Sequence, residues 1–242
     1  MDRLAYTAMT AADRTMQYLQ VRANNLANVN TPGFRADLER AVAVDVEGYG
    51  YDSRHLTKVE NAGVNLAQGS LVATGRDLDL AIKGEGLIAV EYGDGEAYTR
   101  HGSMYLDSEG GLYIGGRPVL GEGGPIVLPE HQKVAITGEG IVQVMAPGEV
   151  EMVEVDRLRL VNPPAAGLVK NEAGLLVTED GQPAEASEEV VLVSGFLESS
   201  NVAVVDELTA TMSLNRLFET QVKMMKAAST LSEAGNRLIR GS

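Results

Sequence analysis

The chain has 242 residues, with 34 Asp and Glu against 20 Lys and Arg, and it contains no cysteine. The net charge of -14 argues against the nucleic-acid backbone and anionic membrane surfaces as partners, and the missing cysteines exclude disulfides, thiolate metal sites and cysteine nucleophiles. The acidic excess lies in the middle: residues 1–40 hold five basic and four acidic side chains, residues 196–242 hold five of each, and residues 41–195 carry a net charge of -15.

The first expected element is an N-terminal helix whose apolar side chains recur at alternating spacings of four and three. This spacing predicts a helix that packs lengthwise on another helix. The helix is expected to end near Asn28, because asparagine tolerates the left-handed conformation and Pro32 cannot continue the hydrogen-bond ladder. Thr31 to Phe34 then predict a type II turn, in which Gly33 supplies the positive φ. The apolar row comprises Ala5, Met9, Ala12, Met16, Leu19, Ala23 and Leu26.

Three asparagines near the end of this helix, Asn24, Asn25 and Asn28, work against it, because their amides compete for backbone hydrogen bonds. A helix cap explains Asn28 but leaves Asn24 and Asn25 without a reason. Buried asparagines in helix bundles fix register and partner choice at a cost in stability. The residues alone leave both interpretations open, capping only and a role in assembly.

The middle of the chain is punctuated by glycine and rich in Val, Ile and Leu. Short alternating runs such as LDLAIKG, GLIAVEYG, YTRHGSMYLD and GIVQVMAPG predict strands of an antiparallel β domain. The expected domains are an N-terminal helix and turn over residues 1–35, a β-rich domain over residues 36–195 and a C-terminal helix over residues 196–242. The periodicity of residues 49–69 is too weak to predict their fold.

At the C-terminus a helix of roughly 35 residues, about 50 Å long, is predicted with two apolar rows side by side. Two rows need two partners. We expect one row to pack on the N-terminal helix in a coiled-coil-like pair and the other to pack on another copy of the chain. The fold class is therefore expected to be α+β. The assembly residues predicted on this helix are Leu208, Met212, Leu214, Leu217, Phe218, Val222, Met224, Met225 and Leu231.

No motif predicts an active site, a cofactor site or a metal site. The histidines at positions 55, 101 and 131 lie far apart and lack the spacing of metal ligands. The glycines around Glu85 predict a hairpin turn rather than a phosphate loop, and no serine lies in a Gly-x-Ser-x-Gly context. The longest apolar runs are shorter than the about 20 residues of a membrane helix, so no membrane insertion is expected. The start of the chain lacks the pattern of a cleaved Sec-type signal.

Four segments of the chain together resemble the flagellar rod, hook and hook-associated axial proteins. ANNLANVNTPGF resembles the N-terminal signature of that family, and TGRDLDLAIKGEGLIAV resembles its central block. YTRHGSMYLDSEGGLYIGGRPVLGEGGPI resembles the following block, and GFLESSNVAVVDELTATMSLNRLFETQVKMM the C-terminal block. The opening MDRLAYTAM and the tail LFETQVKMMKAAS are most similar to the proximal rod members. Leu87, Ile88 and Met104 stand where the family usually has aromatic residues, and they keep these positions apolar.

The resemblance implies a structural subunit of the proximal rod in the bacterial flagellar basal body, and not an enzyme. Such a subunit is exported through the flagellar type III apparatus without a cleaved signal and lies in the periplasmic rod. Its implied partners are copies of itself and the neighbouring proximal and distal rod proteins. A distal rod or hook subunit is the alternative within the family, and a secreted carbohydrate-active β protein is the alternative of another class.

Two hypotheses follow from this resemblance. In the assembled tube, Asn24, Asn25 and Asn28 would make interhelical and backbone hydrogen bonds that set the register and that a monomer does not need. Residues 1 to about 35 and about 200 to 242 would be disordered in the isolated subunit and would fold on assembly, because their two-faced helices lack partners there.

Overall fold

The computed structural model describes residues 2–45, 55–93 and 95–240 of the chain. Helix α1 (Asp2–Ala27) opens it, helix α2 (Val204–Arg240) closes it, and the region between them is built of antiparallel strands. The expected α+β class, with helices at both ends, is confirmed. The chain divides into a helix unit (residues 1–27, 37–62 and 203–242) and a β unit (residues 28–36 and 63–202).

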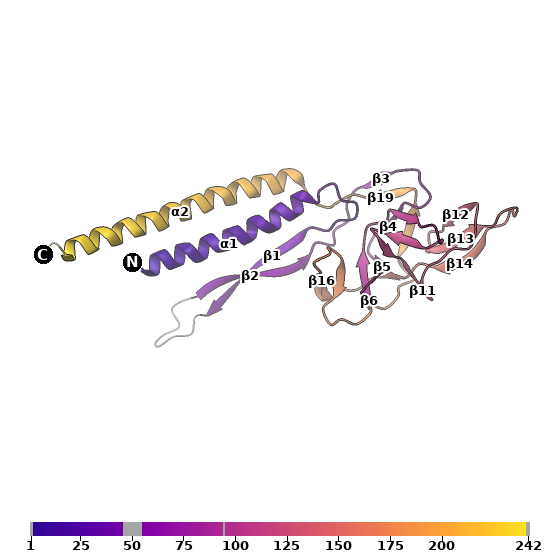
Figure 1. The fold of residues 1–242 in the computed structure, drawn as a ribbon, viewed down its shortest axis with the longest axis horizontal. Coiled ribbons are helices and arrows are strands. Elements are labelled where there is room, and N and C mark those ends of the chain that lie inside the picture. The colour runs from indigo at the N-terminus through magenta and orange to yellow at the C-terminus, as the bar shows by residue number, and fades with distance from the viewer. Residues whose placement is uncertain (1, 46–54, 94, 241–242) are drawn as a thin grey trace. The chain divides into compact units, whose positions relative to one another are not determined.

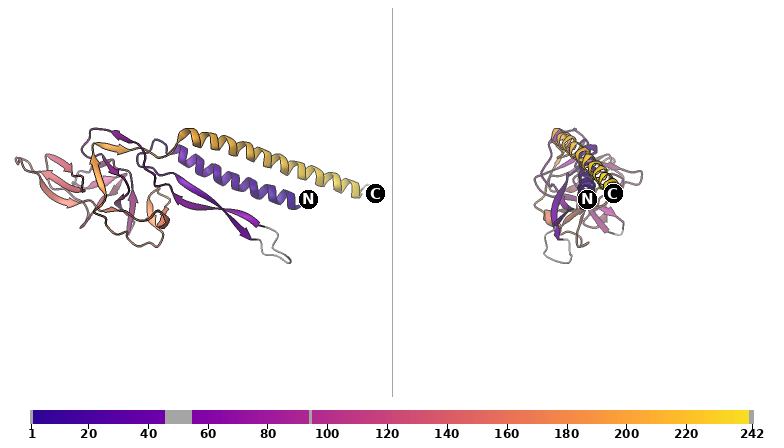
Figure 2. Two further views of the ribbon diagram at one scale, coloured as in Figure 1. Left: turned by 180° about the vertical axis from the view of Figure 1, so that it is seen from behind. Right: turned by 90° about the vertical axis from the view of Figure 1, so that its left-hand side faces the viewer.

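In the helix unit, α1 and α2 lie side by side and run in opposite directions (Figure 1, Figure 2). Thr15 is hydrogen-bonded to Gln221, and Arg22 is hydrogen-bonded to Glu207. Residue numbers therefore rise along α1 while they fall along the facing part of α2, so the two helices are antiparallel. Helix α2 has 37 residues and is therefore about 55 Å long, as the sequence predicts. Strands β1 (Asp37–Asp45) and β2 (His55–Val64) form a two-stranded sheet, and β1 contacts α1 (Figure 1).

This division differs from the expected domains in three places. Residues 28–35 and 196–202 belong to the β unit instead of to the terminal helices, and residues 37–62 belong to the helix unit instead of to the β domain. The reason is hydrogen bonding: the turn after α1 bonds to strand β19, whereas the start of β1 bonds to the side chain of Asn25 in α1.

The β unit is a set of small antiparallel sheets. A five-stranded sheet has the order β15-β5-β6-β17-β16, two three-stranded sheets have the orders β12-β13-β14 and β7-β8-β9, and three pairs are β18-β4, β19-β3 and β10-β11. The strands are β3 (Leu71–Ala73), β4 (Leu80–Lys83), β5 (Leu87–Tyr92), β6 (Gly95–Thr99), β7 (Met104–Leu106), β8 (Leu112–Ile114), β9 (Arg117–Pro118), β10 (Leu120–Gly121), β11 (Gly124–Pro125), β12 (Lys133–Ile136), β13 (Ile141–Met145), β14 (Val153–Arg157), β15 (Leu160–Val161), β16 (Leu168–Lys170), β17 (Leu176–Thr178), β18 (Val191–Ser194) and β19 (Phe196–Glu198), with a 3-10 turn η1 (Ala165–Gly167) before β16.

The core of the β unit follows from the alternation of its strands. In β13, Val142 and Val144 are buried while the residues between and beside them are partly exposed, which is the period of two that places every second side chain inward. One large cluster joins such residues across the sheets, and Ile88 and Met104 lie in it fully buried. Leu87 is buried in a second cluster. The departures from the family's aromatic positions therefore affect core packing.

Candidate functional site

The contact face between α1 and α2 is made of small and polar side chains. Gln221 of α2 donates a hydrogen bond from Nε2 to Oγ1 of Thr15 at 3.0 Å, inside this face. Small side chains let two helix backbones approach closely. Among the helix-unit side chains that the structure describes, no large apolar one is buried. The buried ones are Ala8, Ala12, Thr15 and Asn25 of α1, and Glu207, Gln221 and Ala228 of α2.

The apolar row predicted along α1 lies at the edge of this face. Ala12 is buried, and Ala5, Leu19 and Leu26 are half-buried. The two largest members point outward instead: Met9 is 54% exposed and Met16 is 51% exposed. Ala23 is exposed as well. The packed line runs one residue earlier at two positions, through Ala8 and Thr15, because these smaller side chains permit the closer contact.

The two rows predicted along α2 separate into an inner and an outer group. Leu214, Phe218, Val222 and Met225 are half-buried, and they share the side of the helix that carries buried Gln221 and Ala228. The remaining predicted residues are exposed: Leu208, Met212, Leu217, Met224 and Leu231. These five residues of α2 and the exposed Met9 and Met16 of α1 are together called the exposed apolar rows. The inner group is half-buried within one chain, whereas the side chains of the exposed apolar rows are 43% to 62% exposed.

Asn25 is the central residue of the helix unit's polar contacts. It is 0% exposed, and its Nδ2 donates to the backbone oxygen of Asp37 and to Oε1 of Glu207, both at 3.2 Å. The backbone N–H of Asp37 donates back to Oδ1 of Asn25 at 2.9 Å. Glu207 also accepts from Arg22 Nη1, at 3.1 and 3.2 Å. These Asn25 bonds therefore form within one chain and do not require a neighbouring subunit. The hypothesis that only the assembled tube needs them stays a prediction.

The other two asparagines lie in different surroundings. Asn24 is exposed, and Asn28 follows the last residue of α1. The backbone oxygen of Asn28 accepts from the N–H of Thr31 at 3.1 Å, and its Oδ1 accepts from the Thr31 hydroxyl at 3.2 Å. Asn28 thus closes a turn after the helix, and the end of α1 at Ala27 agrees with the expected boundary. The left-handed conformation expected of asparagine at this helix end is wrong, because no described residue other than glycine has a positive φ.

The Thr-Pro-Gly-Phe turn has the predicted geometry and packs within the β unit. Phe34 N–H donates to the oxygen of Thr31 at 3.2 Å, and Gly33 has a φ of +69°. Gly33 N–H donates to the backbone oxygen of Glu198 at 2.7 Å. A Cβ at position 33 would lie 2.3 Å from the backbone of Arg100 and His101. Glycine is therefore required both for the turn and for its contact with the end of β6.

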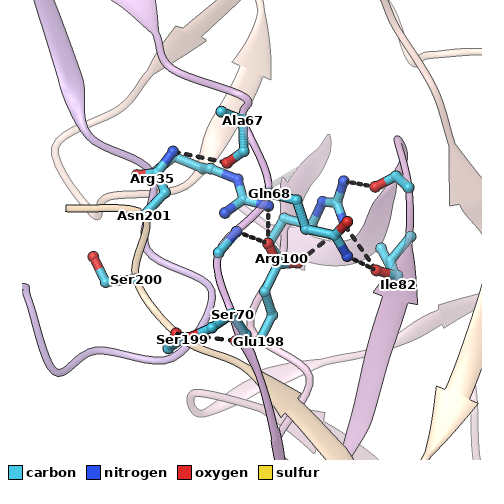
Figure 3. A network of polar contacts seen from close by, with 12 residues as sticks. Arg35, Ala67, Gln68, Ser70, Ile82, Arg100, Glu198, Ser199, Ser200 and Asn201 are labelled. Carbon is cyan, nitrogen blue, oxygen red and sulfur yellow. Dashed lines mark hydrogen bonds and ion pairs between the residues drawn. The ribbon is translucent and has the colours of Figure 1, made fainter. Parts of the chain in front are cut away.

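A buried carboxylate, Glu198, ties this turn to the sheets (Figure 3). Its Oε1 accepts from Arg35 Nη2 at 2.5 Å and from the N–H of Gly69 at 2.7 Å. Its Oε2 accepts from Arg100 Nη1 at 3.0 Å. The side chains of Arg35, Glu198 and Arg100 are exposed by only 2%, 0% and 3%. Burial lowers the pKa of Arg100 to about 10, while Glu198 opposes this shift and keeps the guanidinium charged.

Asn201 adds a second connection three residues further on (Figure 3). Its Oδ1 accepts from the N–H of Ala36 at 2.8 Å, and its Nδ2 donates to the backbone oxygens of Asn65 and Ala67 at 2.7 and 2.9 Å. One amide therefore holds three separate segments of the β unit: the segment after the turn, the segment after β2 and the segment after β19.

Arg35, Arg100, Glu198 and Asn201 were not predicted from the sequence as site residues. A signal was nevertheless present, because each of these residues belongs to one of the segments that carry the family resemblance or directly follows it. Arg35 comes after the Thr-Pro-Gly-Phe turn, Arg100 lies in the Tyr-Thr-Arg block, and Glu198 and Asn201 lie in GFLESSN.

The described residues provide no group of three or more His, Asp or Glu side chains placed to hold a metal ion. Of the histidines, His101 lies beside the turn, where burial lowers its pKa, and His131 is bonded to the oxygen of Pro129. The side chain of His55 is outside the described part of the chain. Neither helix, over its described length, is long and apolar enough to cross a membrane.

Three family models match the chain in order. "Flagella basal body rod protein" matches residues 6–35, "Flagellar hook protein FlgE/F/G D1 domain" matches residues 81–144, and "Flagellar basal body rod FlgEFG protein C-terminal" matches residues 193–238. The first covers most of α1 and the turn. The last covers β19 and nearly all of α2.

The chain is also similar to curated proteins over its whole length. It is 36% identical over 248 residues to "Flagellar basal-body rod protein FlgF" of Escherichia coli (strain K12), covering 99% of both chains. It is 32% identical to the protein of the same name from Caulobacter vibrioides, covering 97% of this chain and 96% of the relative. With "Flagellar basal-body rod protein FlgG" of Bacillus subtilis it shares 34% identity over 47% of this chain and 48% of the relative.

Proposed function

The chain belongs to the FlgF family of flagellar basal-body rod proteins, and from this we propose that it polymerises with neighbouring rod subunits through the exposed apolar rows of α1 and α2. It is a structural subunit of the basal body and not an enzyme. The observation that carries the proposal is the arrangement of side chains in the helix unit: the fully buried ones are small or polar, and seven methionines and leucines of α1 and α2 are exposed. Exposed rows of large apolar side chains are typical of protein contacts.

The proposed partners are copies of this chain and the neighbouring proximal and distal rod proteins. A contact that pairs one surface of a subunit with a different surface of the next does not close on itself, so it generates a filament or tube. The exposed rows lie on two different helices, which supports such a contact. Each buried leucine or methionine contributes about 1.5 to 3 kcal/mol, and repetition around a tube multiplies this contribution. We propose coiled-coil-like packing for the pair of terminal helices α1 and α2, and a mechanical, torque-transmitting role for the assembled subunit.

The relatives favour the proximal rod over the distal rod or hook alternative. FlgF of Escherichia coli is 36% identical over 99% of the chain and FlgF of Caulobacter vibrioides is 32% identical over 97%. Two FlgG proteins that align with 93% and 96% of the chain are 28% identical. The alternative of another class, a secreted carbohydrate-active protein, does not agree with membership of a structural rod family. Export through the flagellar type III apparatus to the periplasmic part of the rod stays a prediction from the resemblance.

The test removes two members of the exposed apolar rows from α2. Met212→Ser with Met224→Ser is expected to leave the purified protein folded, because Met212 is 62% exposed and Met224 is 45% exposed. In cells the same variant is expected to be absent from isolated basal bodies and to abolish motility. The matched control is Val150→Ser with Val153→Ser, which changes exposed apolar residues in the β unit.

The comparison of the two variants decides the proposal. Motility is expected to be normal in the control strain. Normal motility of the Met212 and Met224 variant contradicts the proposed interface, and equal loss in both strains shows that exposed apolar residues in general, rather than those of the helices, are needed.

A further inference from the structure

Glu39 is an ionisable residue of the helix unit that the proposed assembly does not use. It lies on β1, and both of its carboxylate oxygens are buried without a hydrogen-bond partner among the described residues. An ionised carboxylate that is removed from water and receives no hydrogen bond is destabilised relative to its protonated form. Buried side-chain oxygens without partners are rare in proteins and point to a specific role or a specific protonation state.

The charges around Glu39 do not favour a second negative charge beside Glu207. Among the described groups, Arg22 faces Glu39 from α1, Glu207 from α2, and Asp37 from the same strand. Arg22 is already paired with Glu207 at 3.1 Å. Burial raises the pKa of Glu39 from its usual 4.5 to about 7; Arg22 opposes this shift, and Glu207 and Asp37 add to it.

The ligand that fits this site is a proton. Because both oxygens are buried, a metal ion or a cationic side chain from another molecule cannot contact them unless the hairpin moves away from the helices. A proton needs no such space, and it removes the charge that burial disfavours.

We propose that Glu39 is a proton-binding site of the helix unit: its neutral carboxyl group holds the β1–β2 hairpin on the helix pair, and loss of the proton weakens this packing. The inference concerns a single subunit and goes beyond the proposed rod assembly. It therefore holds or fails independently of which neighbours the exposed apolar rows contact.

The direction of the pH dependence follows from proton binding. Since the pKa of Glu39 is higher in the folded unit than in the unfolded chain, the folded unit binds more protons between pH 4.5 and about 7. Hairpin packing is then strongest at low pH, weakens as the pH rises through this interval, and stays weak above it.

The test is hydrogen exchange of the β1 backbone amides in the full chain, compared at pH 5.5 and pH 8.5 after correction for the intrinsic exchange rate. In the unchanged protein, protection is expected to fall by about thirtyfold at the higher pH, since a shift from 4.5 to about 7 in the pKa of Glu39 is involved. In Glu39→Gln, which is neutral at both values, protection is expected to stay constant. The control Glu219→Gln changes an exposed carboxylate of α2 and is expected to show the same fall in protection as the unchanged protein. Constant protection in the unchanged protein, or an equal fall in Glu39→Gln, overturns the proposal.

A second measurement does not depend on the folding of the variant. The side-chain carboxyl carbon of Glu39 is followed by NMR through a pH titration of the unchanged protein, with its signal assigned through the backbone. A midpoint at or above pH 6 supports the proton site. A midpoint below pH 6 overturns it, because the carboxylate would then be ionised at neutral pH in the packed hairpin.

Discussion

The helix unit and the β unit bury different kinds of side chain. In the β unit the fully buried residues include Leu80, Ile88 and Met104, which come from different strands and pack into one core. In the helix unit the buried residues are alanines and polar side chains, while Met16 and Leu231 are more than half exposed. Because burial of large apolar side chains is the main source of stability, the β unit is expected to fold by itself and the helix unit to depend on partners.

Buried charges differ between the two units in the same way. In the β unit, Glu198 receives hydrogen bonds from two arginines and a backbone N–H, so its charge is compensated. In the helix unit, Glu207 is paired with an arginine whose side chain is 39% exposed, and Glu39 has no hydrogen-bond partner among the described residues. The Glu198 carboxylate is held by three hydrogen bonds, although Nε and Nη1 of Arg35 are buried without a partner among the described residues. Glu39 receives no such bond, so burial of its carboxylate is not compensated in the same way.

Limited proteolysis of the dilute protein is expected to show the largest difference between the units. Cleavage within α1 and α2 is expected to be about a thousandfold faster than cleavage within the β unit, because local opening of weakly packed helices needs little free energy while the β unit must unfold globally. Mass spectrometry of the fragments is the measurement. A fragment of about residues 63–202 is expected to survive, together with residues 28–36, which the turn contacts hold in the β unit.

Two outcomes of the digestion change the interpretation. If α1 and α2 resist as long as the β unit, the helix pair is already stable in the monomer, and the exposed apolar rows alone drive polymerisation. If residues 28–36 are removed with α1, the contacts of Gly33 and Arg35 with Glu198 do not hold the turn in solution, and the boundary expected from the sequence at residue 35 is the better one.

Replacing Glu198 is the next largest effect and tests the β unit alone. Glu198→Ala leaves Arg35 and Arg100 buried without their carboxylate, and removing one partner of a buried ion pair costs about 3 to 5 kcal/mol. The measurement is urea unfolding of the full chain, followed by circular dichroism of the strands. Glu188→Ala is the control, because that side chain is 90% exposed, and it is expected to change the free energy of unfolding by less than about 0.5 kcal/mol. A loss below about 1 kcal/mol for Glu198→Ala contradicts a structural role for the network.

Local patterns predicted the elements of both units better than their boundaries. The spacing of apolar residues predicted both helices, and alternation predicted strands such as β4, β5 and β13. The run YTRHGSMYLD, read as one strand, is divided: β6 ends at Thr99 and β7 begins at Met104. A Cβ at Gly102 would lie 1.6 Å from the oxygen of Leu80, so the chain there passes close to another strand. Such a close approach is tertiary and leaves no periodic signal.

The candidate site was predictable only in part, for two physical reasons. Apolar residues at alternating spacings of four and three occur both in contacts within a chain and in contacts between chains. The spacing therefore predicts an apolar stripe on the helix, but it does not show that the side with Ala8 is buried and the side with Met9 is exposed. Long-range pairs are a second difficulty, because Arg35 and Glu198 are 163 residues apart. Nothing in the local sequence of either residue states that the other lies beside it.

The smallest expected effect concerns Asn25 and decides what the asparagines do in the monomer. Asn25→Ala removes the side-chain bonds to Asp37 and Glu207, and loss of buried hydrogen bonds of this kind costs about 1 to 3 kcal/mol. The measurement is hydrogen exchange at the Asp37 amide and in α1. The control, Asn215→Ala, makes the same chemical change at an exposed position of α2, where alanine's higher helix propensity makes the change neutral or slightly favourable. Faster exchange in Asn25→Ala alone means that the helix unit has its own polar framework before assembly. Equal exchange in both variants means that these bonds matter only among neighbouring subunits, and the contrast between the two units is then larger than the single chain shows.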